Sequence, residues 1–441
     1  MKRSFINIIT ISILSIFSIS FFSCSKKRNR EYTTPQIPIS QIEIPSNIKP
    51  TVDEVYPLSE IVSDVEFVQL EVTKESLLRE IYSIQVSDSH ILVEDYDDVF
   101  LYTRQGKFLT KVGQKGQGPG DYVYIICMAL DENNQEIHIL AKDGMKTYGF
   151  DGKFKRNVSL LSYELFSNFD PLIYIWNNHI FLRDKIALGM PRKDIWTWAL
   201  TDTSFQIKQK YYNPEITTRS KELNKQIGSN LGDIKWTEPV HPMVDFYDNN
   251  FTMCFFNGNT IFRFDTDSVS FQPQYCLAFE EKAPFEAASQ WGKSDDRIWD
   301  YYILYDYTIT KNYIYFLLTK ESEGCIARYE KATGKMDYAL YKNEIIERKL
   351  KYRDIIHKSM TIDKMFFRND ISGGCPFRVD YKSENGKYLI DIMNSEDIEK
   401  YINMEDLKKE TVTNETSKQR WIDLLNQLSD DEQIIAIATL K

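Results

Sequence analysis

The sequence predicts an all-β fold, a six-bladed β-propeller with four-stranded blades. Three observations predict it. Short runs rich in Ile, Val, Phe and Tyr alternate with turn residues along most of the 441-residue chain, a strand–turn–strand pattern recurs, and the last repeat lacks one strand. The 27 tyrosines and 26 phenylalanines also suit half-buried strands better than helices.

The repeated unit is a hairpin with a tight turn, preceded by two further strands. Three of the hairpins turn at a Gly-Lys pair, and the other two use Asp-Ser or Thr-Ser. They occupy residues 99–113, 145–160, 195–212, 260–279 and 325–340. Five units of four antiparallel strands are therefore visible.

The sixth unit is incomplete within its own stretch of sequence. Residues 377–393 supply two strands, and residues 433–441 supply a third. We expect the fourth from residues 64–72, near the start of the domain. A last blade shared by N- and C-terminal strands closes the ring without free edges. The alternative, a pair of β-sandwiches, explains neither the repeated turn nor the shared blade.

The glycine-rich stretch VGQKGQGPGDY, residues 112–122, links the first unit to the second. A phosphate-binding P-loop is excluded because the chain has no GxxxxGK[ST] motif and no helical pattern follows Gly120. A dinucleotide fold is excluded because a strand-like run follows instead. We interpret the glycines as structural, since they allow positive φ and close approach where one blade leads into the next.

The same segment carries a family resemblance. KFLTKVGQKGQGPGDYVYI, residues 107–125, resembles the blade-crossing motif of NHL-like six-bladed β-propellers common among Bacteroidetes lipoproteins. The core of that motif is Gly-x-Gly-Pro-Gly-(Asp/Glu)-(Tyr/Phe). The architectural resemblance covers residues 58–441 and implies fold and compartment more than activity. The motif occurs clearly only once, which departs from simple NHL repeats.

Residues 1–23 are predicted to be a lipoprotein signal peptide. A short basic start precedes the uncharged run Phe5–Phe22, and the small Ser23 directly precedes Cys24. SFFSC resembles the lipobox of bacterial lipoproteins, although those boxes usually have Leu where this chain has Phe21. The alternative is a membrane-spanning anchor, since the run is about long enough to cross a bilayer.

Lipidation of Cys24 would hold the mature protein at a membrane through acyl chains. Residues 24–57 are polar and carry five prolines, which predicts a flexible spacer ahead of the propeller at 58–441. Four basic residues follow the cysteine, namely Lys26, Lys27, Arg28 and Arg30. Surface-exported lipoproteins of Bacteroidetes usually have acidic residues there, so the resemblance implies an outer-membrane protein that faces the periplasm.

Charge and motifs exclude several function classes. A net charge of −10 at pH 7 disfavours nucleic acid as a partner. The sequence has no HExxH, GxSxG, CxxC or EF-hand pattern, so we predict no catalytic residue, metal or cofactor. EDYDD at 94–98 is interpreted as solvated turn charge rather than a cation site, and SGGCP at 372–376 as a tight turn rather than a nucleophile. Three histidines recur near the start of second strands, which favours a repeat feature over a metal ring.

The long insertions are predicted to share one face. In a propeller, links from second to third strand and from blade to blade open on one face, here called the insertion face. The opposite side, with links from first to second and from third to fourth strand, is called the turn face. The insertions are Lys185–Asp194, Asn213–Val240, Glu280–Trp299, Tyr341–Asn369 and Asn394–Glu432. Binding sites are often built on such loops.

Aromatic residues of these insertions are the candidate ligand contacts. The predicted binding residues are Trp236, Trp291 and Trp299, with Arg183 and Asp184 beside the blade-three insertion. The alternative is that the rings only fix the insertions onto the propeller. Within 417–428, Trp421 and three leucines form a helical stripe expected to pack over blade six.

The favoured function is a non-catalytic binding or scaffolding module of the cell envelope. Its partner would be a glycan, a peptide or a neighbouring envelope protein, and its membrane contact would be the lipid anchor. The alternative is a hydrolase or lyase that acts on a polymer in the central pocket. An enzyme would need acid, base or metal-binding groups that converge at the channel.

Overall fold

The computed structural model describes the propeller and leaves out the N-terminal region and parts of the insertions. The described residues are 39–159, 172–183, 187–188, 196–213, 235–236, 243–255, 258–283, 300–349, 356–361, 364–428 and 433–441. The predicted signal peptide, Cys24, Asp184, Trp291 and Trp299 lie outside them. Within these ranges no helix is long and apolar enough to cross a membrane.

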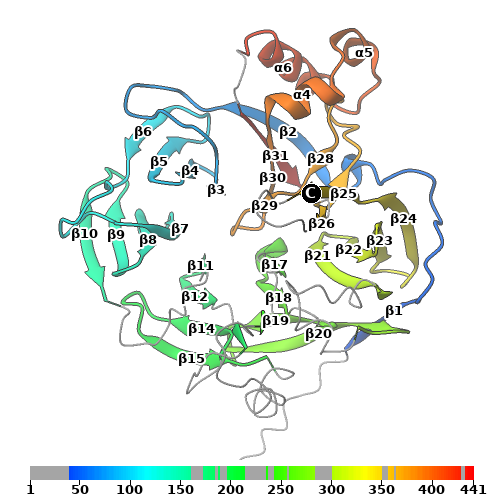
Figure 1. Cartoon of the computed structure of the whole chain (residues 1–441), viewed down its shortest axis with the longest axis horizontal. Helices are drawn as coiled ribbons and strands as arrows, with labels where there is room; N and C mark the ends of the chain where they lie inside the picture. Colours follow the sequence, from blue (N-terminus) through cyan, green and yellow to red (C-terminus); the bar gives the residue numbers. More distant parts are fainter. Residues whose placement is uncertain are drawn as a thin grey trace, which may run out of the picture. The chain divides into compact units, whose positions relative to one another are not determined.

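Six blades, each with four antiparallel strands, are arranged in a ring, which confirms the predicted six-bladed propeller (Figure 1). Blade one contains β3 (Ser83–Val86), β4 (His90–Asp95), β5 (Asp98–Thr103) and β6 (Phe108–Lys111). Blade two contains β7 (Ile125–Asp131), β8 (Glu136–Ala141), β9 (Gly144–Gly149) and β10 (Phe154–Val158). Blade three contains β11 (Leu172–Trp176), β12 (His179–Arg183), β14 (Trp198–Thr201) and β15 (Ile207–Tyr211).

The other three blades follow the same plan. Blade four contains β17 (Met243–Asp245), β18 (Thr252–Cys254), β19 (Thr260–Asp265) and β20 (Ser270–Phe279), with the turn η4 (Tyr247–Asn249) after β17. Blade five contains β21 (Ile303–Ile309), β22 (Tyr313–Lys320), β23 (Glu323–Glu330) and β24 (Met336–Lys342). Blade six contains β29 (Tyr381–Lys382), β30 (Tyr388–Met393), β31 (Ile434–Leu440) and β2 (Val62–Gln69).

Blade six joins the two ends of the domain, as the sequence predicts. Its strand order is β2-β31-β30-β29, and Val65 pairs with Ala438. Val62 and Val65 are completely buried, as are Ile434 and Ala438. Strands from opposite ends of the chain therefore share one core, and the ring has no open edge at its seam.

The second half of the expected spacer is packed on the propeller rather than flexible. Strand β1 (Ser40–Ile44) adds a fifth strand to blade four, parallel to β20 with Ile42 opposite Leu277 (Figure 1). Ile42 and Ile44 alternate with exposed residues and are 2% and 1% exposed. The alternation of buried and exposed residues is enough to bury one face of a short strand. It is hard to recognise in the sequence because prolines flank the segment.

After β1 the chain runs outside blade five and reaches blade six. Thr51 donates its backbone N–H to the carbonyl of Tyr338 at 3.0 Å. The ring of Tyr56 meets that of Tyr315 edge-on at 5.5 Å, and the turn η1 (Leu58–Glu60) then leads into β2. This N-terminal strap, residues 40–60, therefore contacts three successive blades.

Three helices and three small sheets complete the described elements. The helices are α4 (Ser395–Tyr401), α5 (Met404–Lys409) and α6 (Glu415–Leu425). The small sheets pair β13 (Ala187–Leu188) with β16 (Lys235–Trp236), β25 (Glu344–Lys349) with β26 (Ile356–Thr361), and β27 (Phe366–Phe367) with β28 (Phe377–Arg378). The β13–β16 pair joins two of the predicted insertions, so those two lie side by side.

The helical insertion covers blade six as predicted. Asn414 caps α6 by accepting a hydrogen bond from the backbone N–H of Ser417 at 3.0 Å. The Trp421 side chain is fully buried, and its ring stacks on Phe67 of β2 with centroids 4.1 Å apart. Trp421 therefore belongs to the core and not to an exposed binding surface.

The glycine-rich stretch between blades one and two forms a closed loop, which confirms the structural interpretation. Gly113 has φ +63°, and a Cβ at this position would stand 2.7 Å from Cε1 of Tyr148. Tyr148 donates its hydroxyl to the carbonyl of Gly120 at 3.0 Å, and Asp121 accepts the N–H of Gly118 at 2.9 Å. Within the loop, the backbone N–H groups of Gly116, Asp121 and Tyr122 donate to carbonyls of the loop itself.

Candidate functional site: the central channel

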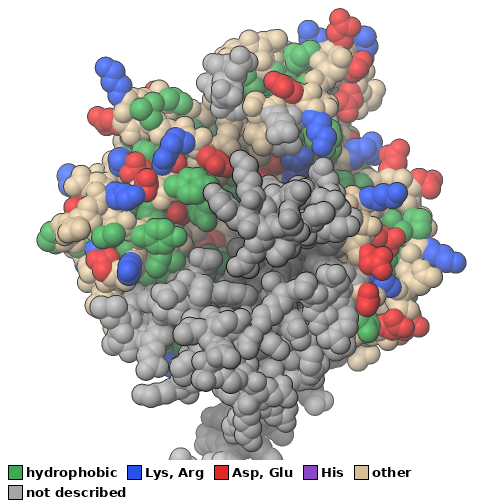
Figure 2. Space-filling view, viewed as in Figure 1, with side chains coloured by type: hydrophobic (Ala, Val, Ile, Leu, Met, Phe, Trp, Pro, Cys, Tyr) green, Lys and Arg blue, Asp and Glu red, His purple; other side chains and the backbone are tan. Residues whose placement is uncertain are grey.

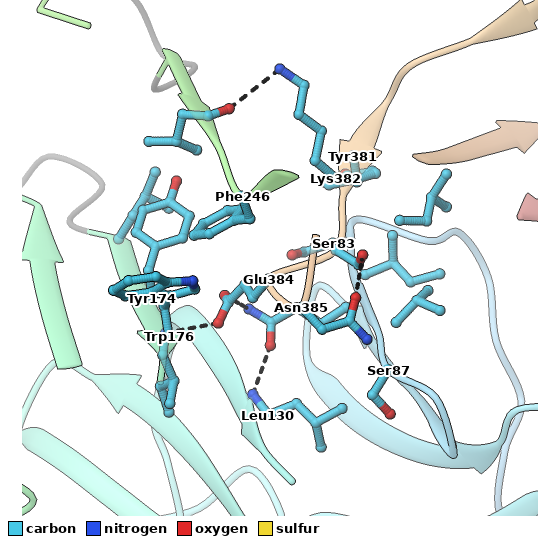
Figure 3. Close-up of a pocket in the computed structure, with 18 of the residues that line it drawn as sticks. Ser83, Ser87, Leu130, Tyr174, Trp176, Phe246, Tyr381, Lys382, Glu384 and Asn385 are labelled. Atoms are coloured by element: carbon cyan, nitrogen blue, oxygen red, sulfur yellow. Dashed lines mark hydrogen bonds between the residues drawn. The ribbon is translucent and has the colours of Figure 1, made fainter. Parts of the chain in front are cut away.

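A cavity of about 810 Å³ occupies the central channel (Figure 3). The innermost strands β3, β7, β11, β17, β21 and β29, or the turns next to them, all contribute to its wall. Its aromatic side chains are Tyr82, Tyr174, Trp176, Phe246, Tyr305 and Tyr381. Its charged side chains are Asp88, Glu94, Asp131, Glu132, Asp306, Lys364, Asp380, Lys382 and Glu384. A cavity of this size and mixed character is typical of a ligand site.

The β29–β30 turn of blade six crosses the channel. Glu384 accepts the backbone N–H of Ile175 on blade three at 2.7 Å through Oε2. Its Oε1 accepts the side-chain amide of Gln85 on blade one at 2.9 Å (Figure 3). Gln85 in turn accepts the N–H of Leu130 on blade two at 2.6 Å. One carboxylate therefore connects blade six to three other blades.

Lys382, on the same turn, reaches blades four and five. Its Nζ donates to the carbonyl of Val244 at 3.3 Å and lies 3.1 Å from Oδ1 of Asp306. Oδ2 of the buried Asp245 is 3.7 Å away. Burial raises the pKa of Asp245, and the positive charge of Lys382 opposes that rise. Lys382 therefore links blade six to blades four and five.

Gly386 completes this crossing turn. It has φ +70°, and a Cβ there would overlap the carbonyl oxygen of Phe246 on blade four. Asp88, on the β3–β4 turn of blade one, accepts the hydroxyl of Tyr388 at 2.9 Å and the amide of Asn385 at 3.1 Å. The crossing turn thus bridges the channel at its turn-face end.

Two buried glutamates of the wall differ in their surroundings. Burial raises the pKa of Glu94 to about 7 and that of Glu384 to about 8. Both oxygens of Glu384 accept hydrogen bonds from the fold. Glu94 is 3% exposed, and no described residue forms a hydrogen bond or ion pair with its carboxylate. Glu94 therefore presents a buried carboxylate that remains available to a ligand.

The other charged wall residues have partners. Lys364 Nζ lies 2.6 Å from Oδ1 of Asp380, and Glu132 Oε1 lies 2.8 Å from Nδ1 of His90. Asp131 accepts the side-chain amide of Asn134 at 2.8 Å. These charged side chains of the wall therefore have ion-pair or hydrogen-bond partners, whereas Glu94 has none among the described residues.

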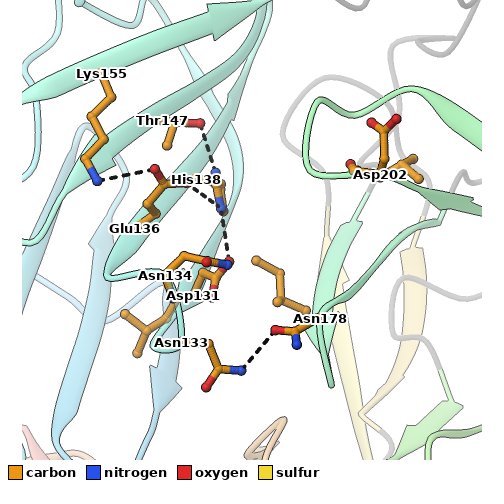
Figure 4. Close-up of polar contacts among 12 residues, drawn as sticks. Asp131, Asn133, Asn134, Glu136, His138, Thr147, Lys155, Asn178 and Asp202 are labelled. Atoms are coloured by element: carbon orange, nitrogen blue, oxygen red, sulfur yellow. Dashed lines mark hydrogen bonds and ion pairs between the residues drawn. The ribbon is translucent and has the colours of Figure 1, made fainter.

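The recurring histidines connect neighbouring blades, in line with a repeat feature. The rings of His90, His138 and His179 meet aromatic rings of the following blade at 4.7, 5.3 and 5.4 Å, namely Phe150, Phe205 and Phe264. His138 Nδ1 lies 3.0 Å from Oγ1 of Thr147, and its Nε2 lies 3.8 Å from Asp131 (Figure 4). Among the described residues, no group of three or more His, Cys, Asp or Glu could hold a metal ion.

The acidic run 94–98 is paired with cations of the protein itself. Asp95 accepts the backbone N–H of Arg79 at 2.9 Å, and Lys115 and Lys111 lie 2.5 and 2.8 Å from Asp97 and Asp98. Glu94, the first residue of the run, is the exception. The sequence therefore misleads here, because Glu94 and Asp95 of this apparently solvated cluster are buried, and Glu94 lies in the channel wall.

Cys375 is a core residue and not an exposed nucleophile. It is 4% exposed and lies in the hydrophobic core under blade six. The described cysteines, Cys127, Cys254, Cys276, Cys325 and Cys375, form no disulfide. Burial raises the pKa of Cys254 to about 12, which keeps that thiol protonated.

Exposed aromatic residues lie on the insertion face of blades one and two. Tyr82 and Tyr96 are 55% and 52% exposed, and their ring centroids are 4.7 Å apart. Tyr124, in the link to blade two, is 62% exposed. Figure 2 shows hydrophobic side chains gathered over these blades. All three tyrosines lie on links that open on the insertion face, and Tyr82 also lines the cavity. We call Tyr82, Tyr96 and Tyr124 the tyrosine rim.

The ligand contacts predicted from the sequence, where the structure describes them, lie on other elements than the tyrosine rim. Trp236 lies on β16 opposite Ala187 of β13, on the joined insertions. Arg183 is 5% exposed, at the end of β12. Burial raises the pKa of Tyr174, a wall residue, and the guanidinium of Arg183 opposes that rise. Arg183 lies on β12, the strand paired with the wall strand β11, and is not itself a wall residue. The tyrosine rim was missed because single tyrosines in short links resemble ordinary strand ends.

Comparison with known families places the chain. Residues 39–439 match the family described as Domain of unknown function (DUF4934). The chain belongs to that family. No curated protein matches it.

A solved structure with a TM-score above 0.5 agrees with the fold, and a second one is less similar. An exported protein of Bacteroides fragilis is 16% identical, with 91% of this chain and 100% of that chain covered and a TM-score of 0.56. A member of the DUF4221 family from Bacteroides vulgatus is 11% identical, with 86% and 97% covered and a TM-score of 0.42. Identities this low show likeness of fold alone.

Proposed function

We propose that the protein is a non-catalytic binding module of the cell envelope. Its ligand, a glycan, a peptide or part of an envelope protein, enters the central cavity from the insertion face. The supporting observation is the cavity of about 810 Å³, bridged at the turn-face end, with the tyrosine rim over blades one and two on the insertion face. Stacking on aromatic rings and hydrogen bonding to a polar wall suit such ligands.

The envelope location rests on the N-terminal sequence. The lipobox-like SFFSC supports lipid attachment at Cys24, and the basic run after it supports an outer-membrane protein that faces the periplasm. The GxGPGDY stretch supports an NHL-like propeller of the lipoprotein type. The likeness to a Bacteroides fragilis protein described as exported is consistent with this location.

Larger ligands would also contact the insertions. We include Trp236, Trp291 and Trp299 in this outer contact surface, with Asp184 beside them. Trp236 is on the β13–β16 pair, which brings two insertions together. Arg183 is buried, so its role in binding would be to support Tyr174 rather than to touch the ligand.

A polymer hydrolase or lyase is the second candidate, favoured by one observation. Two carboxyl groups with raised pKa, Glu94 and Glu384, line the same cavity, and pairs of carboxyl groups catalyse glycoside hydrolysis. However, Glu384 holds two backbone or side-chain donors of the fold. Because a catalytic acid must exchange protons with its substrate, this engagement favours the binder.

The proposal is tested by screening the purified full-length protein against oligosaccharide and peptide arrays. For any ligand found, Tyr82→Ala should weaken binding about tenfold or more, since it removes an exposed ring at the channel mouth. Tyr212→Ala is the matched control, because Tyr212 is 42% exposed after β15, the outer strand of blade three. Equal loss in both variants, or none in Tyr82→Ala, would contradict binding at the channel. Conversion of a ligand to product that is abolished by both Glu94→Gln and Glu384→Gln would establish the enzyme instead.

A further inference from the structure

We propose that Glu94 binds the primary ammonium group of a lysine side chain carried by the ligand. This inference rests on the proposed function, since it assumes that the ligand enters the central cavity. It narrows the ligand to a peptide or protein segment with an exposed lysine. The observations that carry it are the burial of Glu94, the lack of a partner for it and the tyrosines around it.

Glu94 is fixed in the channel wall by the main chain. It lies on β4 opposite Ser83 of β3, and its carbonyl accepts the N–H of Tyr82 at 2.9 Å. Its side chain belongs to the cavity wall and is 97% shielded from solvent. The carboxylate is thus held by two paired strands, and its position does not depend on a loop.

Among the described residues, no positively charged side chain pairs with the Glu94 carboxylate. Burial raises the pKa of Glu94, and no lysine, arginine or histidine in the described part of the chain forms an ion pair with its carboxylate. The two wall lysines are engaged elsewhere, Lys364 with Asp380 and Lys382 with Asp306. A buried carboxylate without a counter-charge is costly, and a cationic ligand would offset that cost.

The surroundings of Glu94 favour a cation on a slender stem. Tyr381 donates its hydroxyl to the carbonyl of Tyr82 at 3.1 Å, and the charge of Glu94 contributes to the raised pKa of Tyr381. The face of the Tyr381 ring attracts ammonium groups, since Lys364 Nζ already lies 5.7 Å from the centre of that ring. Because Glu94 is only 3% exposed, a group on an unbranched aliphatic stem can reach it more readily than an amine attached directly to a sugar ring.

Three small probes test this inference by calorimetry on the full-length protein at pH 8. They are lysine capped at both ends, its Nε-acetylated analogue and glucosamine. Capped lysine should bind about tenfold or more tightly than the acetylated analogue, because only the ammonium forms a charge-assisted contact. Glu94→Gln should abolish this difference. Glu132→Gln, which removes another wall carboxylate that is already paired with His90, should retain it.

The outcomes separate this inference from the proposed function. If capped lysine and its acetylated analogue bind equally, or if Glu94→Gln keeps the preference, the cavity binds ligands but Glu94 does not select an ammonium group. Preferential binding of glucosamine would also overturn the lysine assignment. An equal loss in Glu94→Gln and Glu132→Gln would indicate only the general negative charge of the wall. If no probe binds and the array screen finds no ligand, both proposals fail.

Discussion

The Glu384 carboxylate on blade six accepts the backbone N–H of Ile175 on blade three, at 2.7 Å across the central channel. Propeller blades usually contact their sequence neighbours, and this hydrogen bond instead joins blades on opposite sides of the ring. Together with Lys382 and Gly386, it makes the crossing turn of blade six a brace between the blades. The first prediction concerns that brace.

Gly386→Ala should destabilise the protein strongly. An L-residue at φ +70° costs about 1–2 kcal/mol, and the new methyl group would also overlap the Phe246 carbonyl. Gly334→Ala is the matched control, because Gly334 has φ +72° and its added Cβ would meet no atom closer than 3.8 Å. The difference between the two variants in unfolding free energy, measured with urea, gives the effect of the contact between residue 386 and the Phe246 carbonyl. Equal losses of stability would show that the turn is not braced against blade four.

Trp421→Ala should cost about 3–5 kcal/mol of unfolding free energy. It removes a fully buried ring that stacks on Phe67 and leaves a cavity between α6 and β2. Tyr401→Ala, in the partly exposed helix α4, should cost far less. A mild effect of Trp421→Ala, similar to that of Tyr401→Ala, would mean that the helical insertion does not stabilise blade six.

Glu94→Gln should stabilise the protein at pH 8 and change little in acid. The pKa of Glu94 rises from 4.5 to about 7 on folding, so ionisation of the unfolded chain lowers stability as the pH rises between these values. The neutral amide avoids that loss, which amounts to roughly 2–3 kcal/mol between pH 5 and pH 8. Thermal unfolding of the wild type and of Glu94→Gln at pH 5 and pH 8 measures this loss of stability.

Glu136→Gln provides the opposite control for that experiment. Hydrogen bonds from Arg156 lower the pKa of Glu136, so its contribution to stability is present at neutral pH and is lost as the pH falls through the lowered value. Glu136→Gln should therefore destabilise at pH 8. If Glu94→Gln behaves in the same way, the Glu94 carboxylate has a favourable partner in the folded protein.

Cys24→Ala should release the protein from the membrane fraction or block removal of the signal peptide. The reason is that the acyl chains on Cys24 would supply the membrane attachment. Cys127→Ala, at a buried cysteine of β7, is the control for a cysteine substitution without that effect. Fractionation and gel migration identical to wild type in Cys24→Ala would contradict lipidation.

The sequence predicts the repeat, the shared blade and the helical insertion because each depends on local patterns. Strand periodicity and turn residues reveal the blades, and the stripe that contains Trp421 reveals a helix with one buried face. β1 is missed because prolines surround a short strand whose partner is more than two hundred residues away. Its burial is a tertiary effect with little local signal.

The channel wall is harder to predict than the blades. Glu94 in EDYDD and Glu384 in KSENGK have the composition of solvated turns, yet both side chains lie in the cavity. Nothing local distinguishes a turn at the surface from one that crosses the axis of a ring. The wall is set by six strands from distant parts of the chain, so its chemistry becomes visible only when the ring is assembled.

The pairing of Val65 with Ala438 also determines when the ring can close. A ribosome makes β2 several hundred residues before β31, so β2 has no partner in the sheet until β31 has been made. The same delay applies to β1, which waits for β20. Assembly of the domain is therefore dominated by contacts between distant residues, a topology associated with slow folding. A chain truncated before Ile434 would leave both β2 and β30 with unpaired edges, and such edges promote aggregation.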